Sequence, residues 1–281
     1  MKKTMNYLIG IFFLLSAMST SAQDHSPVPL PDYVVPTCDP RKPCCDTSDN
    51  NKFSLTGMLS TRNVFRGVSY GESPSIQFGM SYWTHGFTFG ITGTATTNGK
   101  TEGFGNVLEN YISYALVSED KLGLTLTVDD YFLFDTASND YFNYNTNITK
   151  HYIETRAELA IGSMPNVDGA RLTLLASYVP YQNKNNNSNT LYFEGNLRIN
   201  KNLNLTLGGV TGSSDLLFYT KSGICNVGVT VLKDLKIFSV PTVCKGAVIF
   251  NPNYDNITRT NGTKIAGIGY NPVNFVFSIC F

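Results

Sequence analysis

Charged side chains recur at every second position in several segments of this chain. The clearest case is "HYIETRAELA", which carries Tyr152, Glu154, Arg156 and Glu158 at alternate places. Because side chains two apart lie on one face of a strand, these four would point the same way. Arg and carboxylate groups gathered on one face can pair across an interior, or they can line a path for ions and polar solutes. The alternation supports both interpretations. It assigns to this polar face Arg62, Glu109, Tyr111, Asp129, Tyr131, Tyr152, Glu154, Arg156, Glu158, Arg171, Tyr192, Glu194 and Arg198.

Groups for catalysis or metal binding are sparse. The three histidines are His25, His85 and His151, and none stands at a spacing from Ser or Asp that predicts a nucleophile and its base. Asp129, Asp130 and Asp135 could offer oxygen ligands to a divalent cation, but such ligands must converge in space. Solvated acidic residues near an outer rim are the favoured interpretation. No catalytic, cofactor-binding or metal-binding residue is therefore predicted, and an enzyme is not expected.

The chain contains six cysteines. In an oxidising compartment they are free to form disulfides, and their pairing stays open. Cys38 could close a local loop with Cys44 or Cys45, while Cys225 could join Cys244 or Cys280 across neighbouring late strands. A Cys-only metal site before residue 53 is the alternative, although no matching His or second CxxC accompanies it.

Composition excludes several classes of protein. The 281 residues carry a net charge of +0, with 15% charged and 12% aromatic side chains, and the mean hydropathy is -0.08. This chain is not basic enough for a nucleic-acid partner and not charged enough for general disorder. After the first 22 residues no apolar run reaches the length of a membrane-spanning helix. If the protein enters a bilayer it must do so as strands, and only a closed barrel pairs every backbone group there.

The first residues have the form of a secretory signal. Lys2 and Lys3 precede the apolar run "YLIGIFFLLSAM", and the small residues before Gln23 predict cleavage after Ala22. Residues 23–52 are rich in Pro and Asp and predict a flexible periplasmic leader. The expected domains are therefore a signal peptide over 1–22, the leader over 23–52 and a barrel over 53–281, located in the outer membrane of a Gram-negative-type bacterium.

From Phe53 onward the pattern is that of transmembrane strands. In "SIQFGMSYW" the residues Ile76, Phe78, Met80 and Tyr82 alternate with Ser, Gln and Gly, and segments of about ten residues with this period are typical of outer-membrane barrels. About twelve antiparallel strands are expected, within a range of ten to fourteen, because boundaries are uncertain by a few residues. They fall near 53–65, 75–83, 87–96, 107–116, 122–133, 151–161, 171–179, 190–199, 203–211, 224–232, 236–244 and 272–281.

Loop lengths give the barrel a direction. Short connections such as "THG", "VSEDK" and the "KD" at Lys233 alternate with long ones such as "FDTASNDYFNYNTNITK" and residues 245–271. Outer-membrane barrels have short periplasmic turns and long outward loops, so an even strand count places both termini in the periplasm. A soluble barrel would also alternate, but it would need large apolar residues on the face that here carries Thr, Ser and Gly. That small, polar face predicts a wet lumen.

The alternating apolar residues of the last strand are expected to have a second role besides facing the membrane. Phe277, Ile279 and Phe281 stand at alternate positions of "FVFSICF". This arrangement resembles the signal by which outer-membrane barrels are recognised by their assembly machinery. Outer-membrane lipid and that machinery are the expected partners, together with small polar solutes or ions.

One segment resembles a known family. "STRNVFRGVSYGESPSIQFGMSYW" contains Phe65-Arg66-Gly67-Val68-Ser69 followed by Pro74 and Gln77. It is similar to the opening hairpin of the TorF-type porin family of bacterial outer-membrane barrels, and the resemblance covers about residues 53–116, including "LENYISYA". It implies a membrane barrel with a transport role and brings no substrate or catalytic residue with it. Arg66 could lie in the pore mouth or pin its loop by pairing with Glu72, and pinning is favoured.

Three functions follow in order of preference. The first is passive passage of small polar solutes or ions through an outer-membrane channel. The second is a closed structural or surface-binding barrel that acts through its long loops. The third is a barrel enzyme, for which the required groups are missing. A continuous wet lumen would favour the first function, and a collapsed lumen with ordered loops would favour the second.

Overall fold

The computed structural model describes residues 52–97, 105–119, 122–134, 140–162, 170–183, 191–214, 216–237, 240–257, 264 and 268–281. All of them belong to one compact unit, Tyr33–Phe281. The expected signal peptide, the leader up to residue 51, Cys38, Cys44, Cys45 and Asp135 lie outside the described residues. Within the described ranges no helix has the length and apolarity needed to cross a bilayer.

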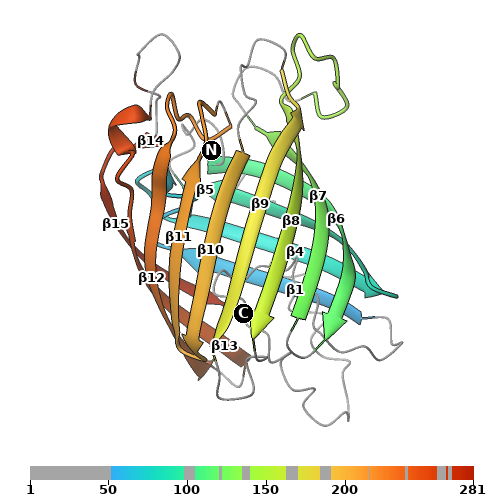
Figure 1. Cartoon of the computed structure of the whole chain (residues 1–281), viewed down its shortest axis with the longest axis vertical. Coiled ribbons are helices and arrows are strands. Elements are labelled where there is room, and N and C mark those ends of the chain that lie inside the picture. The colour runs from blue at the N-terminus through green and yellow to red at the C-terminus, as the bar shows by residue number, and fades with distance from the viewer. Residues whose placement is uncertain are drawn as a thin grey trace, which may run out of the picture. The chain divides into compact units, whose positions relative to one another are not determined.

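The described strands form a closed antiparallel barrel (Figure 1). Each strand pairs with its neighbours along the chain, and β1 closes the wall by pairing with both β4 and β15. Because every wall strand has two partners, the wall has no free edge. Its twelve described strands are β1 (Lys52–Ser60), β4 (Ser75–Thr84), β5 (Phe87–Thr96), β6 (Asn106–Glu119), β7 (Leu122–Leu133), β8 (His151–Gly162), β9 (Arg171–Tyr181), β10 (Leu191–Asn200), β11 (Leu203–Val210), β12 (Gly223–Ile237), β13 (Val240–Phe250) and β15 (Val273–Cys280).

The fold class is therefore as predicted, but the bounds of three strands differ from the expected ones by more than three residues. The first strand ends at Ser60, because the chain then turns into a hairpin made of β2 (Val64–Phe65) and β3 (Val68–Tyr70). Lys233 and Asp234 do not form a turn. β12 continues through them to Ile237, and β13 runs over 240–250, where 236–244 was expected. Lys233 pairs with Cys244 in this longer ladder.

The barrel is apolar outside and polar inside. Met80 and Phe89 are 46% and 43% exposed, whereas their inward neighbours Ser81 and Thr88 are 7% and 2% exposed. A soluble barrel would bury the large apolar side chains and leave the small polar ones to water. The alternation therefore has the sense expected for a wall that faces lipid.

Connections of two lengths separate the ends of the barrel. At one end β4 and β5 are joined by residues 85–86, and β10 and β11 by residues 201–202. We call this the short-turn end. At the opposite end the segments 61–74, 134–150, 211–222 and 251–272 join successive wall strands, and we call this the long-loop end.

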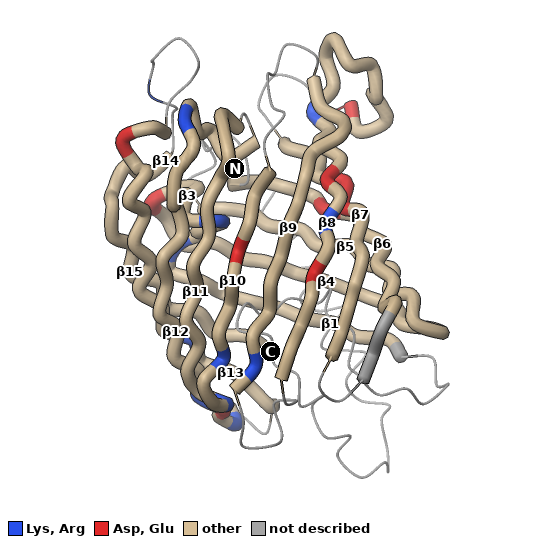
Figure 2. The backbone as a smooth tube through the Cα atoms, viewed as in Figure 1, with Lys and Arg blue, Asp and Glu red and all other residues tan. Residues whose placement is uncertain are grey.

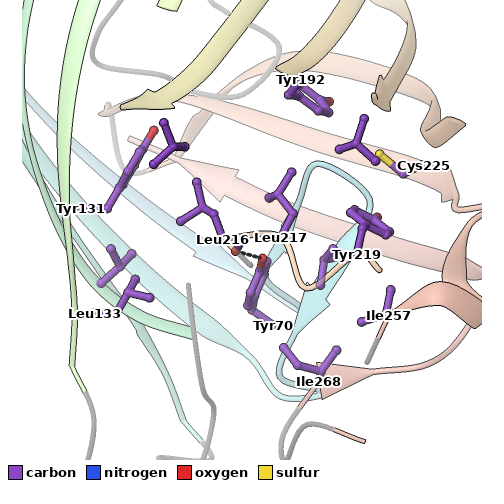
Figure 3. Packing of buried hydrophobic residues seen from close by; sticks show 14 residues of the cluster. Tyr70, Tyr131, Leu133, Tyr192, Leu216, Leu217, Tyr219, Cys225, Ile257 and Ile268 are labelled. Atoms are coloured by element: carbon purple, nitrogen blue, oxygen red, sulfur yellow. Dashed lines mark hydrogen bonds between the residues drawn. The ribbon is translucent and has the colours of Figure 1, made fainter. Parts of the chain in front are cut away.

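Three of the long loops turn back into the barrel. The hairpin of residues 61–74, which we call the lumen hairpin, forms a small sheet in the order β14 (Ile268–Gly269), β3, β2. Side chains from the loop after β11 and from the loop after β13 pack against it (Figure 3). This group, the plug, also contacts the inward-facing Val107, Tyr131 and Tyr192 of the wall. Its apolar members are Val68, Tyr70, Leu216, Leu217, Tyr219, Ile257 and Ile268, each 6% exposed or less.

Candidate functional site

The tip of the lumen hairpin is a tight turn at Arg66 and Gly67. Val64 pairs with Ser69 and Phe65 pairs with Val68, which leaves these two residues as the whole connection. Their φ angles are 50° and 83°, and a two-residue hairpin turn with both φ values positive is of type I′. Glycine is needed at the second position because a Cβ on Gly67 would lie 1.7 Å from the carbonyl oxygen of Cys225 in β12. The tip is thus held directly against the wall.

Arg66 crosses the lumen to Glu154 in β8. Its Nη1 and Nη2 atoms donate to Oε1 at 2.6 Å and Oε2 at 2.8 Å, and the two side chains are 6% and 1% exposed. The guanidinium also lies 4.4 Å from the ring centroid of Tyr192 and 4.8 Å from that of Phe65. Such a fork between aromatic faces is a geometry that Lys cannot reproduce.

The charge of Arg66 is secured by its partner. Burial by itself lowers the pKa of the Arg66 guanidinium, but attraction to the Glu154 carboxylate and the two hydrogen bonds outweigh it and raise the pKa overall. The expected pairing of Arg66 with Glu72 is wrong. Glu72 is exposed and accepts a hydrogen bond from Nδ2 of Asn271 at 2.7 Å. Arg66 binds Glu154 instead, because the lumen hairpin folds into the barrel and carries Arg66 to β8.

Neighbouring loops hold the backbone of the tip. The hydroxyl of Tyr219 donates to the carbonyl oxygen of Arg66 at 3.3 Å, and Nδ2 of Asn251 donates to the carbonyl oxygen of Gly67 at 3.0 Å. Tyr70 donates in turn to the carbonyl oxygen of Leu216 at 3.3 Å. Burial raises the pKa of Tyr70 and of Tyr219, so both phenols stay neutral donors. Hydrogen bonds therefore join the three loops inside the apolar packing of the plug.

A polar cavity of about 280 Å³ lies inside the barrel between the lumen hairpin and the wall strands. We call it the lumen cavity. Asn and Thr side chains, among them Asn196, Thr206 and Asn226, make up much of its wall. Eight residues of the predicted polar face line it, namely Glu109, Tyr131, Arg156, Glu158, Arg171, Tyr192, Glu194 and Arg198.

Other residues of the predicted polar face have separate surroundings. Glu154 is bound by Arg66, and Asp129 lies 3.5 Å from Nη2 of Arg156. Tyr111 is buried at 2% exposure. Arg62 follows the end of β1, outside a wall strand, and donates to Oδ1 of Asn274 at 2.8 Å.

Residues of the family-like motif and of the last strand have distinct surroundings. Val68 and Ser69 are buried in β3, Gln77 lines the lumen cavity, and Pro74 is exposed. On the outer face, Phe277 and Phe281 are both 49% exposed, and Ile279 is half-buried.

Lys245 is a lining residue that the sequence analysis missed. It lies in β13 and lines the lumen cavity, where the Glu194 carboxylate attracts its ammonium group electrostatically. The predicted strand ended at residue 244, one position before Lys245, whereas β13 continues to Phe250. The signal that could have found it is the alternation of Val243, Lys245 and Ala247, continued past Cys244.

A second cluster lies on the outer face at the long-loop end, and it also was missed. His151 is fully buried, its Nδ1 lies 2.7 Å from Oδ1 of Asp130, and its Nε2 lies 2.6 Å from the carbonyl oxygen of Tyr141. Tyr144 stacks on the imidazole with ring centroids 4.0 Å apart and donates to Oδ2 of Asp130 at 2.7 Å. Residues 140–150 thus cover the ends of β7 and β8.

This cluster corrects two expectations. His151 does have an Asp partner, which the register of β7 and β8 supplies by pairing Phe132 with His151 and Asp130 with Ile153. Asp129 and Asp130 do not converge on a cation, because neighbouring strand residues point to opposite faces. Asp129 is also fully buried, so the expectation of a solvated carboxylate near the outer rim is wrong for this residue. Among the described residues no three His, Cys, Asp or Glu side chains are grouped as a metal site requires.

The late cysteines do not join the strands as expected. Cys225 and Cys244 both carry free thiols, and Cys225 is completely buried beside the plug. Cys280 is disulfide-bonded. Neither Cys225–Cys244 nor Cys225–Cys280 is therefore a link in this fold.

Comparison with known proteins adds no relative. The sequence matches no protein-family model, and no curated protein is significantly similar to it. The functional argument consequently rests on the geometry of this chain.

Proposed function

We propose that the protein is an outer-membrane channel for small polar solutes or ions, and that the lumen hairpin closes it at the long-loop end. The observation that carries this proposal is the lumen cavity, which is lined by Arg, Lys, Glu, Asn and Thr side chains within a wall of apolar outer surface. A barrel that served only as a rigid body would be expected to fill this interior with packed side chains. The short-turn end faces the periplasm and the long loops face outward.

The family resemblance supports the same proposal. Its most distinctive residues, Phe65 to Ser69, form the turn and both short strands of the lumen hairpin. Three of them contribute to closure, because Arg66 binds Glu154, Gly67 fits against β12, and Val68 packs in the plug. We therefore propose a relationship to the TorF-type porins in which this motif is the closing element.

The ion pair between Arg66 and Glu154 makes the proposal testable. In Glu154→Gln the buried guanidinium loses its carboxylate, and breaking a buried pair in this way costs about 3–5 kcal/mol. Part of that cost is relieved if the hairpin leaves the lumen. We expect the refolded chain 23–281 to show rare openings in a planar bilayer, and Glu154→Gln to raise the open time at least tenfold, since about 1.4 kcal/mol already corresponds to that factor.

Two matched variants control this experiment. Glu72→Gln removes an exposed carboxylate from the same hairpin and should leave the open time unchanged. The double variant Arg66→Gln with Glu154→Gln removes both charges of this pair and leaves neither partner unpaired, so it should open less often than Glu154→Gln alone. Equal behaviour of Glu154→Gln and Glu72→Gln would contradict the role of the ion pair.

A closed structural or surface-binding barrel is the second candidate, and the plug is the observation that favours it. Seven apolar side chains from three loops pack inside the barrel with their polar groups satisfied, which is more order than a simple entrance requires. Folded protein that stays silent in the bilayer in every variant, Glu154→Gln included, would decide for this candidate and against the channel.

A further inference from the structure

We propose that protonated His151 holds residues 140–150, which we call the outer loop, against the outer face of the barrel, and that the loop is released as the pH rises. Both ring nitrogens of His151 face oxygen atoms. Nδ1 lies 2.7 Å from Oδ1 of Asp130, and Nε2 lies 2.6 Å from the carbonyl oxygen of Tyr141. We call these two contacts the His151 clamp, and because they lie outside the lumen they do not depend on the channel function.

A neutral imidazole beside an ionised carboxylate cannot satisfy both contacts. The neutral ring carries one N–H group and one lone pair. The carbonyl oxygen of Tyr141 only accepts, so Nε2 of His151 must carry a proton. A further proton is needed between Nδ1 and Oδ1 of Asp130, because an ionised carboxylate is also only an acceptor. Imidazole is the stronger base of the two, so this proton makes the pair an imidazolium ion beside a carboxylate.

Burial makes the clamp depend on that proton. His151 is 0% exposed, so its ring nitrogens have no bulk water to turn to. When the proton leaves, a nitrogen lone pair faces an oxygen lone pair inside the protein, and a buried contact left unsatisfied in this way is unfavourable. The clamp is therefore complete at low pH, while the proton is bound, and is lost as the pH rises.

Aromatic rings surround the imidazole and join it to the outer loop. Tyr144 stacks on it with ring centroids 4.0 Å apart, and the ring of Tyr141 meets it edge-on at 5.2 Å. On the wall side the ring centroid of Phe132 lies 4.9 Å from that of His151 and 5.1 Å from that of Tyr141. Phe132 is 0% exposed. Release of the outer loop would therefore uncover an apolar ring at the rim of the long-loop end.

Few other groups near His151 can titrate with it. Figure 2 shows acidic residues at the upper ends of β7 and β8, which adjoin the outer loop. Of the residues that the structure describes, Asp130 alone brings a carboxylate within ion-pair distance of the imidazole. Partial burial and the hydrogen bond to Asp130 raise the pKa of Tyr144, so its phenol stays a neutral donor while histidine titrates. The titratable groups of the elements packed around His151 are Asp130 of β7, Asp140, Tyr141, Tyr144 and Lys150 of the outer loop, and Tyr181 of β9, which contacts Tyr144.

Hydrogen exchange of the outer loop tests the clamp. Refolded chain 23–281 and its His151→Gln variant are compared, with rapid mixing, at each pH from about 5 to about 9, a span that contains the range in which histidine titrates. The amides of Ile148 and Thr149, which donate to the carbonyl oxygen of Asn145, are the reporters. Both proteins share residues 140–150, so intrinsic exchange rates cancel in the ratio. We expect exchange at least about tenfold slower in the wild type at the acid end, and equal rates at the alkaline end.

Two variants separate the clamp from general loosening of the barrel. His85→Asn removes the exposed imidazole of a turn at the short-turn end and should leave the pH dependence of the outer loop unchanged. Asp130→Asn keeps an oxygen beside Nδ1 but removes the charge that favours the imidazolium, so the midpoint of release should fall by about 1 pH unit or more. Heat-dependent mobility in gel electrophoresis checks that each variant is folded.

Nitrogen NMR of the ring reads the protonation state directly. With His25→Gln and His85→Asn in place, His151 is the one histidine left in the chain. Both of its ring nitrogens should carry protons below the midpoint of release, and one of them above it. A ring that holds a single proton throughout, while the outer loop stays protected, would overturn the proposal. Loop exchange with the same pH profile in the wild type and in His151→Gln would overturn it as well.

Discussion

At the scale of single residues, the tip of the lumen hairpin fits closely against the barrel wall. Arg66 has a positive φ, which a non-glycine residue rarely adopts, and its side chain forms the ion pair with Glu154. Gly67 brings the backbone of the hairpin against the carbonyl group of Cys225. Strain of this kind persists only where the surroundings determine it. The turn and the ion pair therefore act as one unit.

Gly67→Ala tests that unit directly. The new Cβ would meet the oxygen of Cys225 at 1.7 Å, and Ala is disfavoured at a φ of 83°. We expect a loss of about 2 kcal/mol or more in the free energy of unfolding, measured by urea titration of the folded barrel. Gly93→Ala is the matched control, because a Cβ there has no atom within 4 Å. A Gly67→Ala protein as stable as Gly93→Ala would refute the close fit of the tip.

At the scale of elements, the lumen hairpin and two other loops form a plug that a barrel wall does not need. β3 pairs with β14, which brings residues 68–70 and 268–269 together, and Leu216 and Leu217 pack beside them. By contrast, residues 140–150 fold over the outer face around His151. The long loops of this barrel thus pack in two places: some inside the lumen and one on the outer face near the rim.

Withdrawal of the hairpin should expose a native reporter. Cys225 is a free thiol with 0% exposure, covered by the tip of the hairpin and by Tyr219. We expect a water-soluble maleimide to label it slowly in the wild type and at least about tenfold faster in Glu154→Gln. The reason is that an unpaired, buried Arg66 destabilises the inward position of the hairpin. Peptide mass spectrometry resolves Cys225 from the other cysteines. Labelling that is equally fast in both proteins would show that the plug does not cover this thiol in solution.

At the scale of the whole molecule, closure of the wall joins residues from its two ends. Gly57 and Phe281 exchange backbone hydrogen bonds at 2.7 and 2.9 Å, and β1 continues the seam by pairing Met58 with Cys280 and Ser60 with Ser278. The ring of Phe281 lies over Gly57, where a Cβ would come within 2.4 Å of it. The outward ring therefore covers the seam as well as facing the surroundings of the barrel.

The orientation of the whole wall can be tested with two charges in one strand. Met80 is 46% exposed on the outer face near the middle of β4, while Gln77 lines the lumen cavity. In lipid vesicles Met80→Arg should cost about 2–4 kcal/mol of folding free energy, the usual penalty for Arg on the lipid face at mid-depth. Gln77→Arg should be nearly neutral, since the lumen is polar. The reverse order of costs would indicate a water-soluble barrel and exclude the membrane location.

Much of the wall could be predicted from the sequence because its cause is local. Side chains alternate with a period of two, so Ser, Thr and charged residues at every second position identify the inner face before any partner is known. The twelve strands and the inward direction of Glu154, Arg156 and Arg198 depend on nothing else. Errors arose where the pattern is interrupted, as at Lys233 and Asp234, whose charges imitate a turn inside β12.

Only the tertiary structure decided what the charges do. Arg66 and Glu154 are 88 residues apart in the sequence, whereas Glu72 is close by. Only the inward fold of the hairpin brings Arg66 to Glu154. The facing of Arg171 and Arg198 depends on strand register, as does the meeting of Asp130 with His151. Alternation determines the face of each strand residue, but the partner of a side chain depends on register and on how loops pack. Those depend on the summed contacts of distant segments, which no local period contains.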